Sequence, residues 1–192
     1  MKYIDEINRG EISKIFCELF FAIDPGYRGR SGEISTQYSN LHTDPNDKFF
    51  IPENVYIIGT MNDIDRSVDS FDFAMRRRFR FVELKADERL EMLASLEDEE
   101  LEAEAIKRMS ALNKEIADVE DLNENYQVGA AYFLKMKTLS FDQLWTDYLE
   151  PLLQEYVHGM YDEDGIMSRF AKAYGYQKPI EGGVDEGSKD QG

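Results

Sequence analysis

Two adjacent carboxylates follow a short apolar segment at the start of the chain. Asp5 and Glu6 come directly after residues 1–4, which predict a short strand. In parallel α/β sheets, ligands bind at the carboxyl ends of the strands, so the pair stands where chemistry can occur. It suits nucleotide hydrolysis, because one carboxylate helps to hold Mg²⁺ and the next polarises the attacking water. Taken alone, the pair favours ordinary capping of the following helix.

A second polar group follows the other strand-like segment. Residues 55–60 are β-branched and aromatic, a pattern that predicts a parallel strand buried on both faces. Asn62 comes just after this segment, at the same expected edge of the sheet. Its side chain can hydrogen-bond the attacking water or a γ-phosphate. Asparagine is also a common turn residue, and that alternative stays open.

Cationic side chains gather further along, although the chain is strongly acidic. Asp65 and Arg66 place opposite charges in a tight turn, and Arg76, Arg77 and Arg78 follow at the end of the next expected helix. Arginine is the residue used for bidentate phosphate contacts and as an arginine finger. Complementing the dipole at a helix C-terminus accounts for one arginine more readily than for three in a row.

The elements that must position these residues change character near residue 85. Residues 1–85 mix strand-like and helix-like patterns, whereas residues 86–178 are almost entirely helical in pattern. The first part predicts a helix over 12–23, a hairpin with arms at 34–38 and 48–51, and a further strand over 79–84. The second part predicts helices over 87–96, 99–119, 141–158 and 165–174. Residues 179–192 predict a disordered tail.

Composition narrows the class of protein. The chain of 192 residues has 22 Lys and Arg against 39 Asp and Glu, a formal net charge of −17. This charge argues against broad contact with a nucleic-acid backbone by this chain itself. Its longest apolar run, residues 19–23, is far shorter than the roughly 20 residues of a membrane span. Cys17, the single cysteine, cannot form an intramolecular disulfide, and we expect a cytoplasmic protein without membrane contact.

In their order along the chain, these motifs resemble the core of the AAA+ ATPases. They are most similar to the McrB family, the GTP-dependent motor subunits of modified-cytosine restriction systems. The similarity lies in a Walker B sequence at residues 5–9, a Met-Asn-x-x-Asp-Arg-Ser loop at 61–67, an Arg-Arg-Arg-Phe segment at 76–79, and the lid segments 126–129 and 152–156. It covers about residues 1–175.

The resemblance implies an α/β part followed by an all-α part. Residues 1–85 would supply strands 3, 4 and 5 of a P-loop NTPase core, and residues 86–178 the helical lid. The family's sheet order is 5-1-4-3-2, and no Gly-x-x-x-x-Gly-Lys-Ser/Thr sequence occurs in the chain. We therefore expect the C-terminal part of a longer protein, beginning at Walker B, and little or no hydrolysis by this chain alone.

The resemblance also implies a role for each matching residue. Asp5 would support Mg²⁺ through water, and Glu6 would be the catalytic carboxylate. Asn62 would sense the nucleotide. Asp65 and Arg66 would belong to the loop that faces the nucleotide and the activating McrC subunit.

Arg77 and Arg78 would be the arginine fingers, acting in trans in a hexameric ring. The choice among Arg76, Arg77 and Arg78 stays open. Residues 63–64 read Asp-Ile where the family often has Thr-Ala, and Gln127 stands where many AAA+ proteins carry a sensor arginine. The choice between GTP and ATP also stays open.

Three functional interpretations remain. The leading one is part of a McrB-like GTPase or ATPase that uses Mg²⁺, forms a homo-oligomeric ring and powers DNA translocation with a McrC-like nuclease. In that case DNA would be recognised by a domain outside this sequence. The first alternative is a protein remodeller of the MoxR or dynein-related kind. The second is a non-catalytic fragment that docks on an AAA+ ring and donates an arginine.

Overall fold

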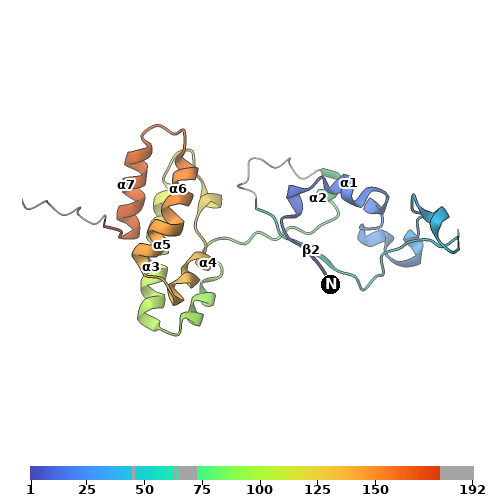
Figure 1. Ribbon diagram of the computed structural model, residues 1–192, viewed down its shortest axis with the longest axis horizontal. Coiled ribbons are helices and arrows are strands. Elements are labelled where there is room, and N and C mark those ends of the chain that lie inside the picture. The colour runs from blue at the N-terminus through green and yellow to red at the C-terminus, as the bar shows by residue number, and fades with distance from the viewer. Residues whose placement is uncertain (45, 63, 65–72, 178–192) are drawn as a thin grey trace, which may run out of the picture. The chain divides into compact units, whose positions relative to one another are not determined.

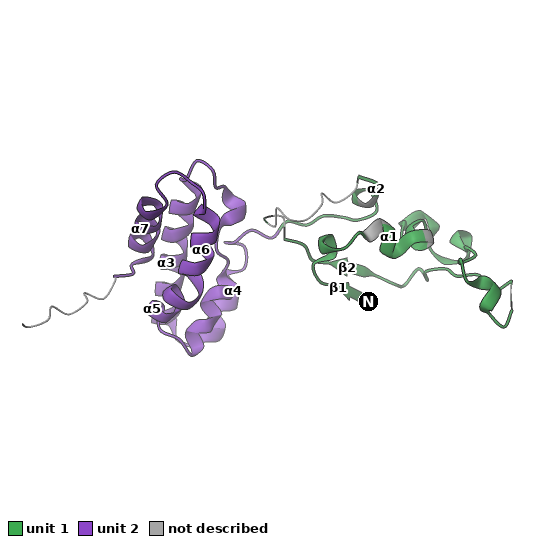
Figure 2. Cartoon of the chain, turned by 45° about the horizontal axis from the view of Figure 1, so that its top comes forward, with its two compact units in different colours: residues 1–83 green, residues 84–192 purple. Residues whose placement is uncertain are grey.

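The structure is a computed structural model that describes residues 1–44, 46–62, 64 and 73–177 (Figure 1). It divides into two compact units, residues 1–83 and residues 84–192 (Figure 2). Asp65 and Arg66, for which the resemblance implies a nucleotide-facing loop, lie outside the described residues, as does the expected tail at 179–192.

A small parallel sheet organises unit 1. Strand β1 (Lys2–Ile4) pairs with β2 (Ile57–Gly59), and the two strands lie side by side in Figure 2. Tyr3 lies opposite Ile58 in this pairing. The pairing continues past the strands, because the Thr60 amide donates to the Ile4 carbonyl at 3.0 Å. The carboxyl ends of both strands therefore lie at one edge, as the sequence predicted.

Ile7 forms the centre of the packing beneath this edge. It is buried, and it packs against Ile4, Phe16, Phe20, Met61 and Phe79. Gly59 permits its close approach, since a Cβ at Gly59 would lie 2.9 Å from the Ile7 Cδ1 atom. A second buried cluster is formed by Ala22, Ile23 and Ile51.

The prediction that residues 55–60 are buried on both faces is wrong for this structure. Tyr56 is 68% exposed and Ile58 is 44% exposed, and Tyr3 on the neighbouring strand is 62% exposed. The described sheet has two strands, so one face packs on Ile7 while the other is left in contact with solvent.

The third predicted strand is also absent. Residues 79–84 are all described, and none of them is in a strand. A strand needs a neighbour to pair its backbone groups. In the sheet order that the resemblance implies, that neighbour is strand 1, which has no counterpart among the described strands.

The helical and hairpin segments of unit 1 are shorter than the sequence pattern predicts. The helix expected over 12–23 divides into α1 (Ile12–Phe16) and a 3-10 turn (Cys17–Phe20), because Cys17 has a positive φ of 39°. Cys17 is exposed. The hairpin arms meet at one antiparallel bridge between Ile34 and Phe49. The described part of unit 1 has five further short helical segments: α2 (Phe73–Arg76) and 3-10 turns at Ile7–Arg9, Pro25–Tyr27, Gly29–Gly32 and Ser39–Leu41.

Unit 2 is helical, as predicted. Its elements are a 3-10 helix (Leu90–Leu96), α3 (Glu99–Ala117), a 3-10 turn (Glu124–Tyr126), α4 (Ala130–Phe133), a 3-10 turn (Leu134–Lys137), α5 (Phe141–Leu144), a π-helical turn (Trp145–Leu149), α6 (Glu150–Val157) and α7 (Glu163–Tyr174). Asp98 caps α3, and Ser140 with Gln143 forms a capping box at the start of α5. Local sequence signals thus set the helix starts.

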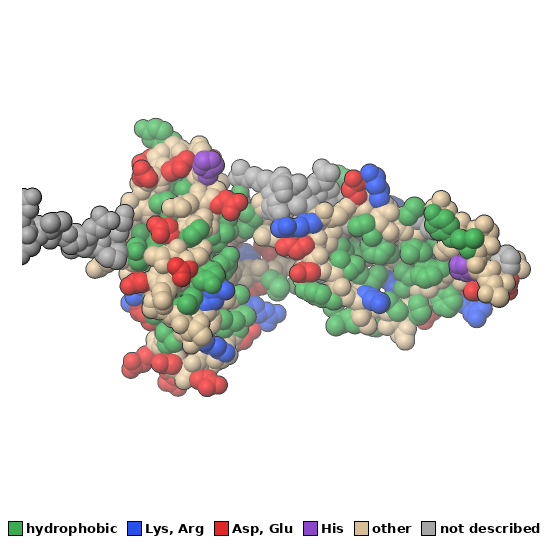
Figure 3. Space-filling model, viewed as in Figure 1, with side chains coloured by type: hydrophobic (Ala, Val, Ile, Leu, Met, Phe, Trp, Pro, Cys, Tyr) green, Lys and Arg blue, Asp and Glu red, His purple; other side chains and the backbone are tan. Residues whose placement is uncertain are grey.

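An aromatic cluster fills the core of unit 2. Trp145, Tyr174, Phe133 and Phe170 are all fully buried. The rings of Trp145 and Tyr174 have centroids 5.1 Å apart, and Arg108 covers the cluster at 4.3 Å from the Phe141 ring. Acidic side chains are spread over the visible surface of this unit, whereas hydrophobic ones gather on the visible face of unit 1 (Figure 3). No helix in the described part of the chain is long and apolar enough to span a membrane.

Candidate functional site

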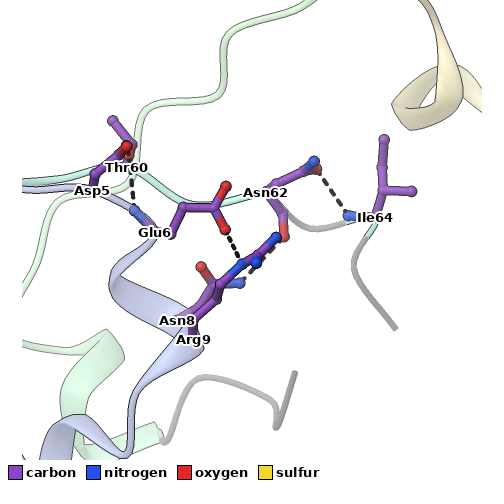
Figure 4. Close-up of polar contacts among 7 residues, drawn as sticks. All are labelled: Asp5, Glu6, Asn8, Arg9, Thr60, Asn62 and Ile64. Atoms are coloured by element: carbon purple, nitrogen blue, oxygen red, sulfur yellow. Dashed lines mark hydrogen bonds and ion pairs between the residues drawn. The ribbon is translucent and has the colours of Figure 1, made fainter. Parts of the chain in front are cut away.

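Thr60 joins the two carboxylate-bearing residues at the carboxyl edge of the sheet. Its hydroxyl group donates to Asp5 Oδ1 at 2.5 Å and accepts from the Glu6 amide at 3.2 Å (Figure 4). The Thr60 carbonyl in turn accepts from the Ile7 amide at 2.8 Å. Asp5 is exposed and Glu6 is half-buried. One residue of β2's extension therefore fixes the chain from Asp5 to Ile7.

Glu6 has an unusual backbone and an internal partner. Its φ of 51° and ψ of 48° lie in the left-handed region, which non-glycine residues seldom occupy. Its carboxylate forms an ion pair with Arg9, one turn further along the chain (Figure 4). Strained backbone of this kind concentrates at functional sites, where neighbouring contacts hold it.

Asn62 lies beside the carboxylates, as the sequence predicted. Its carbonyl accepts from the Asn8 side-chain amide at 3.2 Å, and its own Oδ1 accepts from the Ile64 amide at 3.2 Å (Figure 4). The second contact is an Asx turn, so the turn alternative for Asn62 is realised by its oxygen. The side-chain nitrogen of Asn62 is a donor that this turn does not use.

The three arginines have different surroundings. Arg78 donates through Nε to the Phe20 carbonyl at 3.1 Å and through Nη1 to the Ala74 carbonyl, and its guanidinium lies 4.0 Å from the Phe20 ring. Arg76 lies 5.6 Å from the Phe81 ring, and the side chain of Arg77 is exposed. The structure therefore ties Arg78 into unit 1 and presents Arg77 to solvent.

Sequence reasoning missed two residues of this site. Thr60 was read as the last residue of a strand, although its position one residue beyond β2 places it opposite the turn after β1. Arg9 was read as part of a family motif, although its spacing of three from Glu6 is the spacing at which helical neighbours meet.

The residues present fit a magnesium ion held together with nucleotide phosphates. Mg²⁺ is usually bound through one or two carboxylates, several waters and the substrate's phosphates. Asp5 offers one oriented and exposed carboxylate at the strand edge. Among the described residues, no group of three or more His, Cys, Asp or Glu side chains gathers as a metal site. A Mg²⁺ site of this kind does not need such a group.

In unit 2, a buried asparagine holds the loop that carries Gln127. Asn113 on α3 is 7% exposed, and its side chain bonds both the amide and the carbonyl of Val128. Gln127 donates back to the Asn113 carbonyl at 3.3 Å. The loop that resembles the family's lid segment is thereby fixed to the longest helix of the unit.

Comparison with known proteins matches these two groups of residues to two different domain models. A family model described as the AAA domain of the dynein-related subfamily matches residues 1–79, which hold β1, β2 and the carboxylate pair. A second model, the alpha-helical lid domain of McrB, matches residues 104–164. The chain is also 34% identical over 167 residues to the Type IV methyl-directed restriction enzyme EcoKMcrB subunit of Escherichia coli (strain K12).

This chain is a McrB-like AAA+ protein. The alignment with the E. coli subunit covers 80% of the McrB-like chain and 36% of the subunit, so the chain spans about a third of the length of that relative. The AAA match carries the sheet edge with Asp5, Glu6 and Asn62, and the lid match carries Asn113 and Gln127.

Proposed function

We propose that this McrB-like chain carries the Mg²⁺-supporting and water-activating part of an AAA+ nucleoside triphosphatase site. The observation that carries the proposal is the meeting of Asp5, Glu6 and Asn62 at the carboxyl ends of two paired parallel strands. This edge is where α/β proteins bind their ligands. The similarity to a restriction enzyme subunit supports the same interpretation.

Each residue has a distinct task in this proposal. The nucleotide would supply the phosphoryl group, and Mg²⁺ when bound would neutralise the charge that develops on it. Asp5 would support the metal through water with its oriented carboxylate, and Glu6 would polarise the attacking water. Because Glu6 is paired with Arg9, that ion pair opens or rotates before Glu6 acts as a base. The Asn62 side-chain nitrogen orients the water or the γ-phosphate.

The contacts of the arginines support Arg77 as the finger. A finger acting on a neighbouring subunit's nucleotide must reach outward from its own subunit. The Arg78 guanidinium donates hydrogen bonds to the backbone carbonyls of Phe20 and Ala74, whereas the side chain of Arg77 is exposed. In this proposal Arg78 positions the end of α2, and Arg77 contacts the nucleotide bound by the next subunit.

The complete protein would be a ring-forming motor. It would hydrolyse GTP or ATP, and it would power DNA translocation together with a McrC-like nuclease. Asp65 and Arg66 would face the nucleotide and that nuclease subunit. DNA would be contacted by a part of the protein outside this sequence, which agrees with the net charge of −17.

Nucleotide turnover tests the proposal directly. The coding DNA upstream of Met1 is read first for an in-frame phosphate-binding loop, and the complete protein is then purified. We expect Glu6→Gln to abolish Mg²⁺-dependent GTP or ATP turnover while nucleotide binding persists. Glu11→Gln is the matched control, because Glu11 is exposed and pairs with Lys14 on the same turn of chain. Equal turnover by both variants would overturn the proposal.

The dynein-related family model on residues 1–79 favours a second candidate, a protein remodeller. That motor would use the same carboxylate pair but act on protein. A neighbouring gene for a nuclease subunit would favour the restriction motor, and a neighbouring gene for an adhesion domain would favour the remodeller. DNA-stimulated turnover by the complete protein distinguishes them biochemically.

A further inference from the structure

The hydroxyl group of Thr60 makes two contacts that converge on the carboxylate pair. It donates its one proton to Asp5 Oδ1 at 2.5 Å, and it accepts from the Glu6 amide at 3.2 Å (Figure 4). A hydroxyl group is the side-chain group that can donate and accept in this way with one atom. A valine of the same shape could do neither.

The backbone of Thr60 adds two more bonds to the same turn. Its amide donates to the Ile4 carbonyl at 3.0 Å, and its carbonyl accepts from the Ile7 amide at 2.8 Å. These bonds bracket Glu6, whose left-handed φ of 51° is sparsely populated by residues other than glycine. Such a conformation persists only when its surroundings hold it. The Glu6 amide is the group in this turn that depends on the hydroxyl of Thr60.

Asp5 depends on the same hydroxyl for its orientation. Its side chain is exposed, so no packing around it selects one rotamer. The bond to Oδ1 selects one, and it leaves Oδ2 as the oxygen that the hydroxyl does not engage. Partners of this kind orient a metal-supporting carboxylate and tune its affinity for the metal.

We propose that Thr60 is a positioning residue whose single hydroxyl sets both the Asp5 carboxylate and the left-handed turn of Glu6. The expected effect of Thr60 on catalysis rests on the proposed nucleotide hydrolysis. The expected effect of Thr60 on the geometry of Asp5 and Glu6 is independent of that proposed function. Loss of the hydroxyl releases Asp5 from its orientation and Glu6 from its amide partner, while the backbone bonds to Ile4 and Ile7 persist.

Amide hydrogen exchange of the full chain, followed by NMR, tests the geometry without nucleotide. In Thr60→Val we expect exchange of the Glu6 amide to accelerate about fivefold, the loss of one net hydrogen bond. The Ile7 amide should stay within about twofold of the original, because its acceptor is a backbone carbonyl. Thr43→Val is the control for an added valine, since Thr43 is exposed in the same unit.

A second pair of variants covers the case in which valine disturbs folding. Thr60→Ser and Thr60→Ala differ by one oxygen atom, so their difference isolates the hydroxyl. We expect Thr60→Ser to retain slow exchange at Glu6 and Thr60→Ala to lose it. Equal exchange at Glu6 in the serine and alanine variants would overturn the proposal, whatever the nucleotide assays show.

The dependence of turnover on Mg²⁺ tests the catalytic consequence in the complete protein. We expect Thr60→Ala to raise the half-saturating Mg²⁺ concentration about tenfold and to lower kcat, with the KM for nucleotide little changed and serine restoring both. A purely structural loss would lower kcat by reducing the active fraction and leave the Mg²⁺ dependence unchanged, which would contradict the positioning role. Absence of turnover in the unsubstituted protein would refute the proposed function, while the exchange result would still decide the geometry.

Discussion

The side chain of Asn113 bonds both backbone polar groups of Val128, in the way that a neighbouring strand would. Its Nδ2 atom donates to the Val128 carbonyl at 2.9 Å, and its Oδ1 atom accepts from the Val128 amide at 2.7 Å. Both residues are buried, so these groups are shielded from water. Asn113 is the buried polar residue that links α3 to the loop carrying Gln127.

Replacing Asn113 by leucine is therefore expected to destabilise unit 2 strongly. The substitution leaves a buried amide and a buried carbonyl without partners, at a cost of about 3 kcal/mol in the free energy of unfolding. Urea unfolding followed by Trp145 fluorescence reports on this unit, because Trp145 is buried in its core. Asn125→Ala, at an exposed position of the same loop, should change the unfolding free energy by less than about 0.5 kcal/mol. Equal effects of the two substitutions would contradict the role given to Asn113.

Alanine substitutions of Arg77 and Arg78 should have different effects, one on nucleotide turnover and the other on the stability of unit 1. Arg78→Ala removes bonds to two carbonyls and the contact with the Phe20 ring, and it should destabilise unit 1 by about 1–2 kcal/mol. Arg77→Ala should leave stability unchanged. In the assembled complete protein, Arg77→Ala should lower kcat by about 10³-fold, the usual effect of removing an arginine finger.

Amide exchange of residues around Ile7 measures the first effect, and steady-state nucleotide turnover measures the second. Mixed rings add a control for the trans arrangement. Subunits carrying Arg77→Ala should regain turnover when they are mixed with Glu6→Gln subunits, because each supplies what the other lacks. No recovery in the mixture would argue against a finger acting between subunits.

Gly59 is expected to tolerate no side chain. A Cβ atom at this position would meet Ile7 at 2.9–3.2 Å, and Ile7 lies in the packed cluster under the carboxylate turn. Gly59→Ala should cost about 1–3 kcal/mol of unit 1 stability, the usual effect of overpacking. Gly26→Ala is the matched control, since its nearest atom would lie 3.4 Å away, at ordinary contact distance. Amide exchange of the Ile7 and Thr60 amides provides the measurement, and unchanged rates in Gly59→Ala would disprove the clash.

The raised pKa values of two tyrosines predict how the stability of unit 2 depends on pH. Burial raises the pKa of Tyr156 to about 12 and also raises the pKa of Tyr174, whose hydroxyl group donates to the Phe141 carbonyl at 2.9 Å. The folded state therefore keeps these protons at a pH where the unfolded chain releases them. Their contribution to stability is complete below about pH 10, the value of an unperturbed tyrosine, and is lost as the pH rises toward 12.

Urea midpoints at pH 8 and at pH 11, read from Trp145 fluorescence, test this dependence. The original chain should lose stability between the two values. Tyr156→Phe should lose less, because phenylalanine has no proton to release. An identical pH dependence in the two chains would contradict the raised pKa of Tyr156.

Much of unit 2 was predictable from local sequence. Apolar spacing gave the positions of α3 and α7, and the Ser140 to Gln143 capping box marks the start of α5 within one residue of its predicted beginning. These signals act between residues three or four positions apart. Unit 1 was harder, because the expected strand over 79–84 depends on a distant partner strand and does not form in this structure.

The sequence by itself determined that Asp5, Glu6 and Asn62 follow two strands whose carboxyl ends share an edge. When these two segments pair in parallel, their carboxyl ends necessarily lie at the same edge of the sheet. Tertiary structure alone decided that the Thr60 hydroxyl bonds both the Asp5 carboxylate and the Glu6 amide, and that Arg78 turns inward while Arg77 stays in solvent. Thr60 and Asp5 are 55 residues apart, and Arg78 and Phe20 are 58 apart. Contacts of that span depend on the register and packing of whole elements, which no local pattern in the chain encodes.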